Sequence, residues 1–297
     1  MRKALLMLSF FILSPVFSDI FIVRENTPEQ AKLSAAIVSR FKEVLPKTVL
    51  LEINILPDGT LDRKPAADSP FIIVLSKKAL DIINGFFPGT PVIAAGLESA
   101  SGTSSEGANV SFVFSLPGAS SFLSLARKFK GDLSLIGTIY LSDEYDAYTE
   151  YLGKEFAWAG IEFIPVKLHS KSEIFTALNE LLKRKPDLVF IIPDFSLFDV
   201  NSLRLVHLNA VKAFTMTAGT SRAFTQGGIL FSVDIGYEQI ADQTVRLAAD
   251  VMRKWKKQIV YLECLKYFIN TNTASKIGIE IPENVLEGAV ERISVVN

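Results

Sequence analysis

The side chains in this sequence that could do chemistry are hydroxyl, carboxylate and aromatic groups, and they form no catalytic set. There are two histidines, His169 and His207, and neither has the carboxylate or cysteine spacing of a metal site. The sequence contains no Gly-x-Ser-x-Gly elbow and no phosphate-loop motif. It therefore predicts no catalytic residue, no metal ion and no cofactor, which disfavours a secreted α/β enzyme.

Two polar segments allow other interpretations. Thr103 to Gly107 is a loop of small polar residues that could hold a nucleophile. Asp143, Glu144 and Asp146 could bind a cation, but acidic residues also favour a helix N-terminus, where the helix dipole is positive. We favour the helix start for the acidic set.

Binding has stronger support, because polar and aromatic residues follow apolar, strand-like runs. In open α/β sheets, ligands bind beyond the carboxyl ends of strands, and helix N-termini there suit a carboxylate. The candidate ligand-binding residues at such positions are Ser76, Glu98, Ser115, Tyr145, Asp194, Phe195 and Asp234.

Each candidate also has a structural interpretation that the sequence leaves open. The two serines, and Ser196 with them, could be helix caps worth about 1 kcal/mol each. The two aspartates could hold crossings of the chain through backbone hydrogen bonds. The two aromatic residues could sandwich a flat ligand or pack against a neighbouring helix.

The elements that would position these residues alternate along the chain. Thr27-Pro28-Glu29-Gln30 is a capping box that predicts a helix start, and the strand-like runs are continuously apolar, as in parallel sheets covered on both faces. This alternation predicts α/β layers. Strands are expected at 20–23, 49–56, 71–75, 91–95, 110–114, 133–141, 161–166, 188–192, 213–216 and 229–233, with helices over 145–159 and 196–209 among others.

The N-terminus predicts export. Arg2 and Lys3 precede an apolar run from Ala4 to Leu13, and Val16-Phe17-Ser18 is a small-x-small cleavage signal, so residues 1–18 read as a signal peptide. A retained signal anchor is the alternative, although the apolar run is about half the roughly 20 residues that span a bilayer. Cleavage would leave 29 basic against 32 acidic residues, which favours neither nucleic acid nor an anionic membrane surface as a partner. Cys264 is the one cysteine, which excludes an internal disulfide.

The last quarter of the chain, Phe231 to Ile293, carries a family resemblance. A strand ends on an aspartate, a Gly-Tyr step and a long helix follow, and an Ile-Asn strand end precedes a short Ala-bearing helix and an Ile-Pro step. This order resembles the type I periplasmic binding proteins of ABC transporters, in the group that includes tryptophan-binding members. The residues that carry it are Asp234, Gly236, Tyr237, Ile240, Thr244, Leu247, Val251, Trp255, Ile269, Asn270, Ala274, Ile281 and Pro282.

The resemblance implies an α/β type I periplasmic-binding-protein fold, with two doubly wound parallel-sheet lobes joined by three crossings. It places lobe 1 at residues 19–115 plus 236–265, and lobe 2 at 116–235 plus 266–297. The crossings are expected near 115–117, 234–236 and 264–268. One departure is the segment 57–69, where the family has a full helix and this chain has Pro, Asp and Gly without a helical apolar period.

Carried over residue by residue, the resemblance matches Ser76, Asp194 and Asp234 to the family's strand-end positions. It fails where specificity is set, because Gly96-Leu97-Glu98 replaces a polar-Pro step and Asp143-Glu144-Tyr145 replaces a Glu-Asn-Ser step.

The resemblance implies a periplasmic or extracytoplasmic protein, monomeric and not an enzyme. It would capture a small metabolite, such as an amino acid or related carboxylate, between its lobes for an ABC permease. The alternative is an orphan receptor of the same fold that feeds a membrane sensor or acts through protein contacts.

Overall fold

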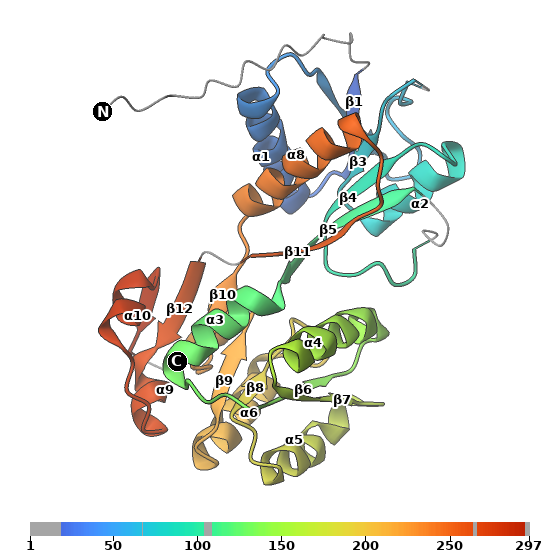
Figure 1. Ribbon diagram of the computed structural model, residues 1–297. Coiled ribbons are helices and arrows are strands. Elements are labelled where there is room, and N and C mark those ends of the chain that lie inside the picture. The colour runs from blue at the N-terminus through green and yellow to red at the C-terminus, as the bar shows by residue number, and fades with distance from the viewer. Residues whose placement is uncertain (1–18, 67, 104–108, 264–265, 295–297) are drawn as a thin grey trace, which may run out of the picture.

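The alternating apolar and amphipathic segments fold into two mainly parallel sheets, each covered by helices on both faces (Figure 1). The computed structural model describes residues 19–66, 68–103, 109–263 and 266–294. The predicted signal peptide, residues 1–18, and Cys264 lie outside the described residues. We call the part built on the six-stranded sheet the first lobe, and the part built on the seven-stranded sheet the second lobe.

The first lobe has the strand order β11-β5-β4-β3-β1-β2, with all neighbours parallel. Helices α1 and α8 pack on each other and cover one face, while α2 covers the other (Figure 1). The bounds are β1 Ile20–Glu25, α1 Pro28–Val44, β2 Leu50–Ile55, β3 Ile72–Val74, α2 Lys77–Phe86, β4 Val92–Leu97, β5 Val110–Pro117, α8 Tyr237–Arg253 and β11 Ile259–Leu262.

The second lobe has the order β13-β12-β10-β9-β8-β6-β7, parallel except for the antiparallel pair β10 and β12. Helices α3, α4, α9 and α10 share one apolar core, and α5, α6 and α7 share another. The bounds are α3 Ala119–Phe129, β6 Leu135–Tyr140, α4 Asp146–Trp158, β7 Glu162–Lys167, α5 Ile174–Lys183, β8 Leu188–Phe190, α6 Val200–Lys212, β9 Met216–Gly219, α7 Arg222–Gln226, β10 Phe231–Asp234, β12 Lys266–Asn270, α9 Thr271–Lys276, α10 Glu283–Gly288 and β13 Glu291–Ile293.

Local capping explains where the sequence-based bounds are right and where they are wrong. Thr27 caps α1 as expected, its hydroxyl accepting from the Gln30 N–H at 3.3 Å. The helix expected from residue 196 begins instead at Val200, because Asp199 and Ser202 form a reciprocal capping box. The strand expected over 213–216 is wrong, since α6 runs on to Lys212 and β9 occupies 216–219.

The shortened connection between β2 and β3 is a feature of the first lobe. The described residues of the segment 57–69 form no helix there, as the sequence predicts. An antiparallel bridge joins Ile55 to Leu61 instead, and Asp62 accepts hydrogen bonds from both the backbone N–H and the side-chain amide of Asn54, at 3.0 and 2.9 Å. A folded turn therefore replaces a helix on this edge.

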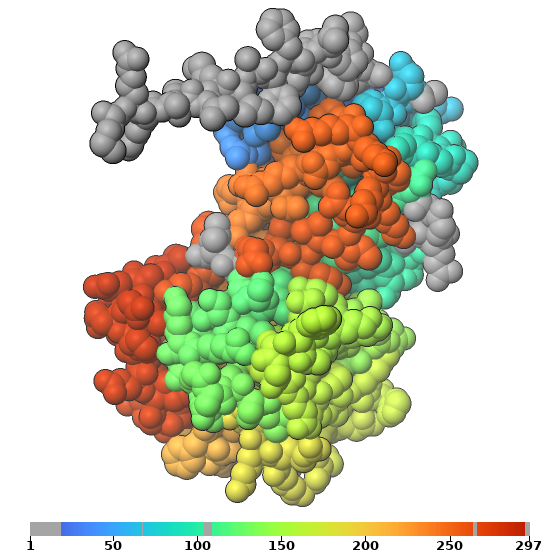
Figure 2. All heavy atoms as spheres, viewed as in Figure 1, coloured from blue at the N-terminus to red at the C-terminus, as the bar shows by residue number. Residues whose placement is uncertain are grey.

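Three crossings join the lobes, from β5 to α3, from β10 to α8 and from β11 to β12. Aromatic side chains brace them, with the Tyr261 ring of β11 stacked on the Tyr151 ring of α4 at a centroid distance of 4.1 Å. The Tyr148 hydroxyl donates to the Pro117 carbonyl at 2.9 Å, and the Ala119 N–H donates to the Tyr151 hydroxyl at 3.2 Å. The molecule narrows at this waist (Figure 2).

Across the described ranges, no helix is both long enough and apolar enough to traverse a bilayer.

The carboxylate of Asp187, just before β8, should make the stability of the second lobe sensitive to acid. Burial opposes its ionisation, but bonds from Lys130, Ser134 and Leu135 outweigh it and lower the pKa of this carboxyl to about 2. An unfolded aspartate has a pKa of about 3.9. The carboxylate therefore adds stability that is complete well above that value and is lost as the pH falls toward about 2, roughly 2 kcal/mol in total.

We expect Asp187→Asn to lower the free energy of unfolding by about 2 kcal/mol near neutral pH, and by much less near about pH 2.5. Urea denaturation across this range measures both values, with the exposed Asp132→Asn in the neighbouring loop as the control. If the loss of unfolding free energy caused by Asp187→Asn were as large at low pH as at neutral pH, this role would be contradicted.

Candidate functional site

Strand ends from the two lobes meet at the side chain of Tyr145. This residue follows β6, in a single turn of 3-10 helix over Asp143–Tyr145. Its hydroxyl lies 2.9 Å from Glu98 Oε2, which follows β4 of the first lobe, and 2.7 Å from the Pro193 carbonyl oxygen, which follows β8 of the second. Tyr145 and Glu98, both candidates from the sequence, are thus in direct contact across the lobes.

A second contact across the lobes lies beside the first. The Lys77 ammonium forms a 2.5 Å ion pair with Glu144, one residue before Tyr145. Lys77 opens α2, and the preceding residue, Ser76, caps that helix by accepting from the Ala79 N–H at 3.1 Å. The capping interpretation of Ser76 is confirmed, and the cap places Lys77 at the contact. Lys77 carries no signal in the sequence beyond its place after that cap.

A bulge in β4 directs Glu98 toward the second lobe. The pairing of β4 with β5 shifts register between Ala95 and Leu97, and Gly96 at this point has a φ of 78°. A side chain at Gly96 would be strained by that angle, and its Cβ would lie 2.5 Å from Leu33 Cδ2. The step Gly96-Leu97-Glu98, where the chain departs from the family pattern, is therefore a bulge that re-aims the strand end.

The Glu98 side chain is exposed, whereas Tyr145 is only 3% exposed. Part of the Glu98 side chain nevertheless lies against protein atoms that keep water away from its carboxyl group. This partial desolvation raises the pKa of the carboxyl above its ordinary value. Burial and the neighbouring charge of Glu98 also raise the pKa of the Tyr145 hydroxyl, which stays protonated. The site thus gathers three groups at one point: a neutral phenol, an accessible carboxylate and a backbone carbonyl.

Asp194 supports this site from behind. It is 1% exposed, and its carboxylate accepts from the backbone N–H groups of Leu141 at 2.7 Å and Ser142 at 2.8 Å, and from both the N–H and the hydroxyl of Ser196. Burial raises its pKa, but these hydrogen bonds outweigh that effect and hold the pKa below its ordinary value. The carboxylate fixes the loop that carries Tyr145, and its own oxygens are occupied.

The side chains of the three remaining candidates form no hydrogen bond with Tyr145 or Glu98 among the residues described, although the Phe195 N–H donates to the Pro193 carbonyl at 3.1 Å. Ser115 lies within β5, not at a helix start, because Gly118 is the N-cap residue of α3. Phe195 is 65% exposed, with its ring centroid 6.2 Å from that of Phe224. Asp234 ends β10 and is paired in register with Lys266 of β12. The capping interpretation of Ser115 is therefore wrong; Ser196 is not a cap either, since Asp199 caps α6.

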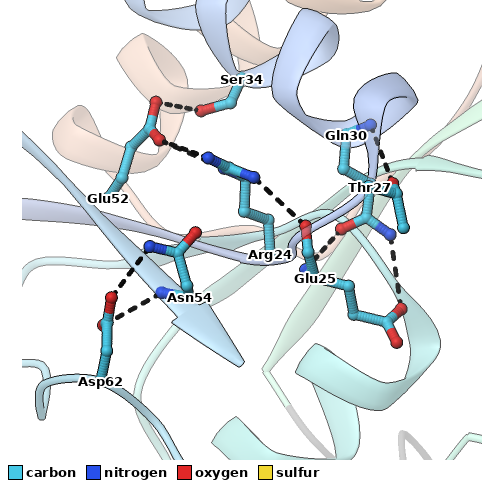
Figure 3. Close-up of polar contacts among 8 residues, drawn as sticks. All are labelled: Arg24, Glu25, Thr27, Gln30, Ser34, Glu52, Asn54 and Asp62. Carbon is cyan, nitrogen blue, oxygen red and sulfur yellow. Dashed lines mark hydrogen bonds and ion pairs between the residues drawn. The ribbon is translucent and has the colours of Figure 1, made fainter. Parts of the chain in front are cut away.

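A cavity of about 520 Å³ lies at the carboxyl ends of β1 and β2, and none of the seven candidates lines it. Its wall includes Arg24, whose guanidinium bonds to Glu52 at 3.1 Å and to the Glu25 carbonyl at 3.3 Å (Figure 3). The Asn54–Asp62 pair forms another part of the wall. Arg24 directly follows the strand expected at 20–23, but no local pattern in the sequence predicts the hydrogen bonds that shape this cavity.

The other polar groups offer no catalytic set. Lys167 binds both Asp143 and Asp146 at 2.6 Å, so an internal cation already neutralises two residues of the acidic set. His207 is buried in α6, where burial lowers its pKa. Among the residues described, no group of three His, Cys, Asp or Glu side chains could hold a metal ion.

Replacement of Asp194 tests its supporting role. Asp194→Ala leaves the N–H groups of Leu141 and Ser142 without their acceptor, and we expect the free energy of unfolding to fall by about 3 kcal/mol. Urea denaturation measures this change, with Asp132→Ala as the exposed control, expected within about 0.5 kcal/mol of the parent. Parent-like stability of Asp194→Ala would show that the carboxylate does not brace the loop.

No protein-family model and no curated protein matches this sequence significantly. Solved structures do match. A ligand-free, open substrate-binding protein with adhesive properties from Clostridium difficile has a TM-score of 0.62 at 14% identity, over 94% of this chain and 100% of that one. An ABC domain in complex with L-Trp from Streptococcus pneumonia has a TM-score of 0.53 at 18% identity, over 93% and 100%.

A third similar structure is a periplasmic ribose ABC transporter protein from Conexibacter woesei. Its TM-score is 0.53 at 15% identity, over 89% of this chain and 95% of that one. At these identities the likeness establishes the fold. The type I periplasmic-binding architecture of two lobes joined by three crossings, which the last quarter of the sequence implies, is thereby confirmed.

Proposed function

We propose that this chain, which has the type I periplasmic-binding-protein fold, is an exported solute-binding protein and not an enzyme. It would capture a small metabolite between its lobes and deliver it to an ABC permease. The proposed lobes are residues 19–115 with 236–265, and 116–235 with 266–297, after removal of residues 1–18. The proposed site is the contact between Glu98 and Tyr145, with Ser76 and Asp194 holding its walls.

The observation that carries this proposal is the meeting of strand ends from both lobes at a solvent-accessible carboxylate. Glu98 comes from the first lobe, whereas Tyr145 and Pro193 come from the second. A solute that bonds to both sides gains contacts only when the lobes are together, so its binding favours the closed arrangement. Such a site gives affinity without bond-making, which agrees with the absence of a nucleophile–base pair in the sequence.

The hinge is compatible with this motion. Only three connections of the chain join the lobes in the described structure, so few backbone segments have to change for the lobes to move relative to each other. The stacked rings of Tyr151 and Tyr261 lie beside these connections. Hinge closure concentrates its changes in backbone angle in a few residues at element ends. The short segments Gly118, between β5 and α3, and Ile235–Gly236, between β10 and α8, are such places.

One observation favours the alternative, an orphan receptor that feeds a membrane sensor or acts through protein contacts. The Tyr145 hydroxyl already contacts both Glu98 and the Pro193 carbonyl, so side chains of the protein itself occupy part of the space between the lobes. A cleft that these contacts keep closed permanently would bind no solute.

A thermal-shift screen of the chain from Asp19 onward decides between the two. The panel contains amino acids, amines, carboxylates, nucleosides and sugars. A solute that binds only the folded state adds about 2.7 kcal/mol to stability at one hundred times its dissociation constant, and so raises the melting temperature. We expect at least one class to do so.

Glu180→Gln, an exposed change on α5, serves as the control, and its hits should equal those of the parent. A panel without any stabilising solute would reject the solute-binding proposal and favour the orphan receptor.

A further inference from the structure

The hydroxyl of Tyr145 has one hydrogen and two acceptor neighbours. Its oxygen lies 2.9 Å from Glu98 Oε2 and 2.7 Å from the Pro193 carbonyl. A carbonyl accepts only, and an ionised carboxylate accepts only, so one of the two contacts has no hydrogen in it. The Tyr145 side chain is buried, which makes an acceptor–acceptor contact at this point costly.

The charged groups around Glu98 do not supply the missing hydrogen-bond donor. Asp194 is saturated by its own donors from Leu141, Ser142 and Ser196. Lys77, the cation that acts on Glu98, is bonded to Glu144 at 2.5 Å. Burial is the main cause that raises the pKa of Glu98; the charges of Glu144 and Asp194 add to it, while the Tyr145 hydrogen bond and Lys77 oppose it.

The single Tyr145 hydrogen cannot serve both Glu98 and the Pro193 carbonyl, and Lys77 is already paired with Glu144. Glu98 is therefore short of a further donor and of a balancing positive charge. Two sources could supply them, a proton on Glu98 itself or a donor brought by the bound solute. The exposure of Glu98 lets a solute reach it while Tyr145 remains covered. The Pro193 carbonyl already accepts from the Phe195 N–H at 3.1 Å and faces the Tyr145 hydroxyl, so the open acceptor is the exposed Glu98 carboxylate. An ammonium group has three donors and a positive charge, so it can bond to this carboxylate and leave the Tyr145 hydrogen to the Pro193 carbonyl.

We infer that the solute is a cation, a primary amine or a related N–H donor whose charged group binds the Glu98 carboxylate beside the Tyr145 hydroxyl. This inference rests on the proposed solute-binding function and adds the chemical class of the ligand. It differs from the carboxylate expected from the sequence, because the surplus at this contact is of acceptors, not of donors. A carboxylate at the same point would meet Glu98, Glu144 and the carbonyl without a free donor of its own.

Three four-carbon probes of matched length separate the charge classes: putrescine as the cation, butanediol as the neutral molecule and succinate as the anion. Isothermal titration of the chain from Asp19 onward measures each. We expect putrescine to bind, with butanediol and succinate at least about tenfold weaker, the difference that a charge-assisted hydrogen bond makes. Putrescine should bind more weakly as the pH falls through the pKa of Glu98, because a proton then competes with it.

Two variants assign the effect to the carboxylate. Glu98→Gln keeps the size of the side chain, and its amide can donate to the Tyr145 oxygen, so we expect a folded protein whose putrescine affinity falls by about tenfold or more. Tyr145→Phe keeps the carboxylate, and its affinity should stay closer to that of the parent. Glu180→Gln on α5 controls for the loss of one surface charge.

The possible results are distinct. Succinate or butanediol binding more tightly than putrescine would overturn the cation inference and leave the solute-binding function in place. Undiminished putrescine affinity in Glu98→Gln, or an equal loss in Tyr145→Phe, would also overturn it. If none of these probes binds and no solute of the thermal-shift panel raises the melting temperature, the proposed function is rejected, and the inference with it. If Glu98→Gln fails to unfold cooperatively, the pH dependence of the parent decides the matter.

Discussion

The contact between the lobes depends on a phenol that must serve two acceptors with one hydrogen. Tyr145 reaches this position because Asp194, buried behind it, holds the N–H groups of Leu141 and Ser142 and thereby fixes the turn that starts α4. Glu98 reaches it from the other lobe through the bulge at Gly96. A buried carboxylate and a glycine in a left-handed conformation thus bring one pair of oxygens together, and the helix cap at Ser76 places the neighbouring ion pair of Lys77 with Glu144.

The waist holds the two lobes in the arrangement that makes this contact. Three crossings of the chain pass through it, and Tyr148 and Tyr151 of α4 tie the second lobe to Pro117 and Tyr261 of the first. The aromatic packing lies in a core that runs on from one lobe to the other. Apolar packing at the waist therefore joins the lobes, and under the proposed function the polar contacts at the strand ends are the ones that a bound solute would strengthen.

The sequence predicts the fold well because its signals are local and repeated. Continuous apolar runs mark parallel strands, and Thr27 and Ser76 mark helix starts that the structure contains. It predicts less where a local competitor acts, as at Asp199, whose capping box moves the start of α6 past the expected Ser196. The pairing of Tyr145 with Glu98 joins residues 47 positions apart on different lobes, and no local pattern encodes it. Asp194 illustrates the same limit, since only the four hydrogen bonds that its carboxylate accepts distinguish a structural role from a free ligand-binding group.

Hydrogen–deuterium exchange with and without the solute that gives the largest thermal shift tests the central claim most directly, because it reports where both lobes become protected. Our account predicts slower exchange at once in residues 96–99 of the first lobe and in 141–146 and 193–196 of the second. Protection confined to one lobe, or to residues 24–27 and 54–57 around the cavity at the ends of β1 and β2, would contradict it.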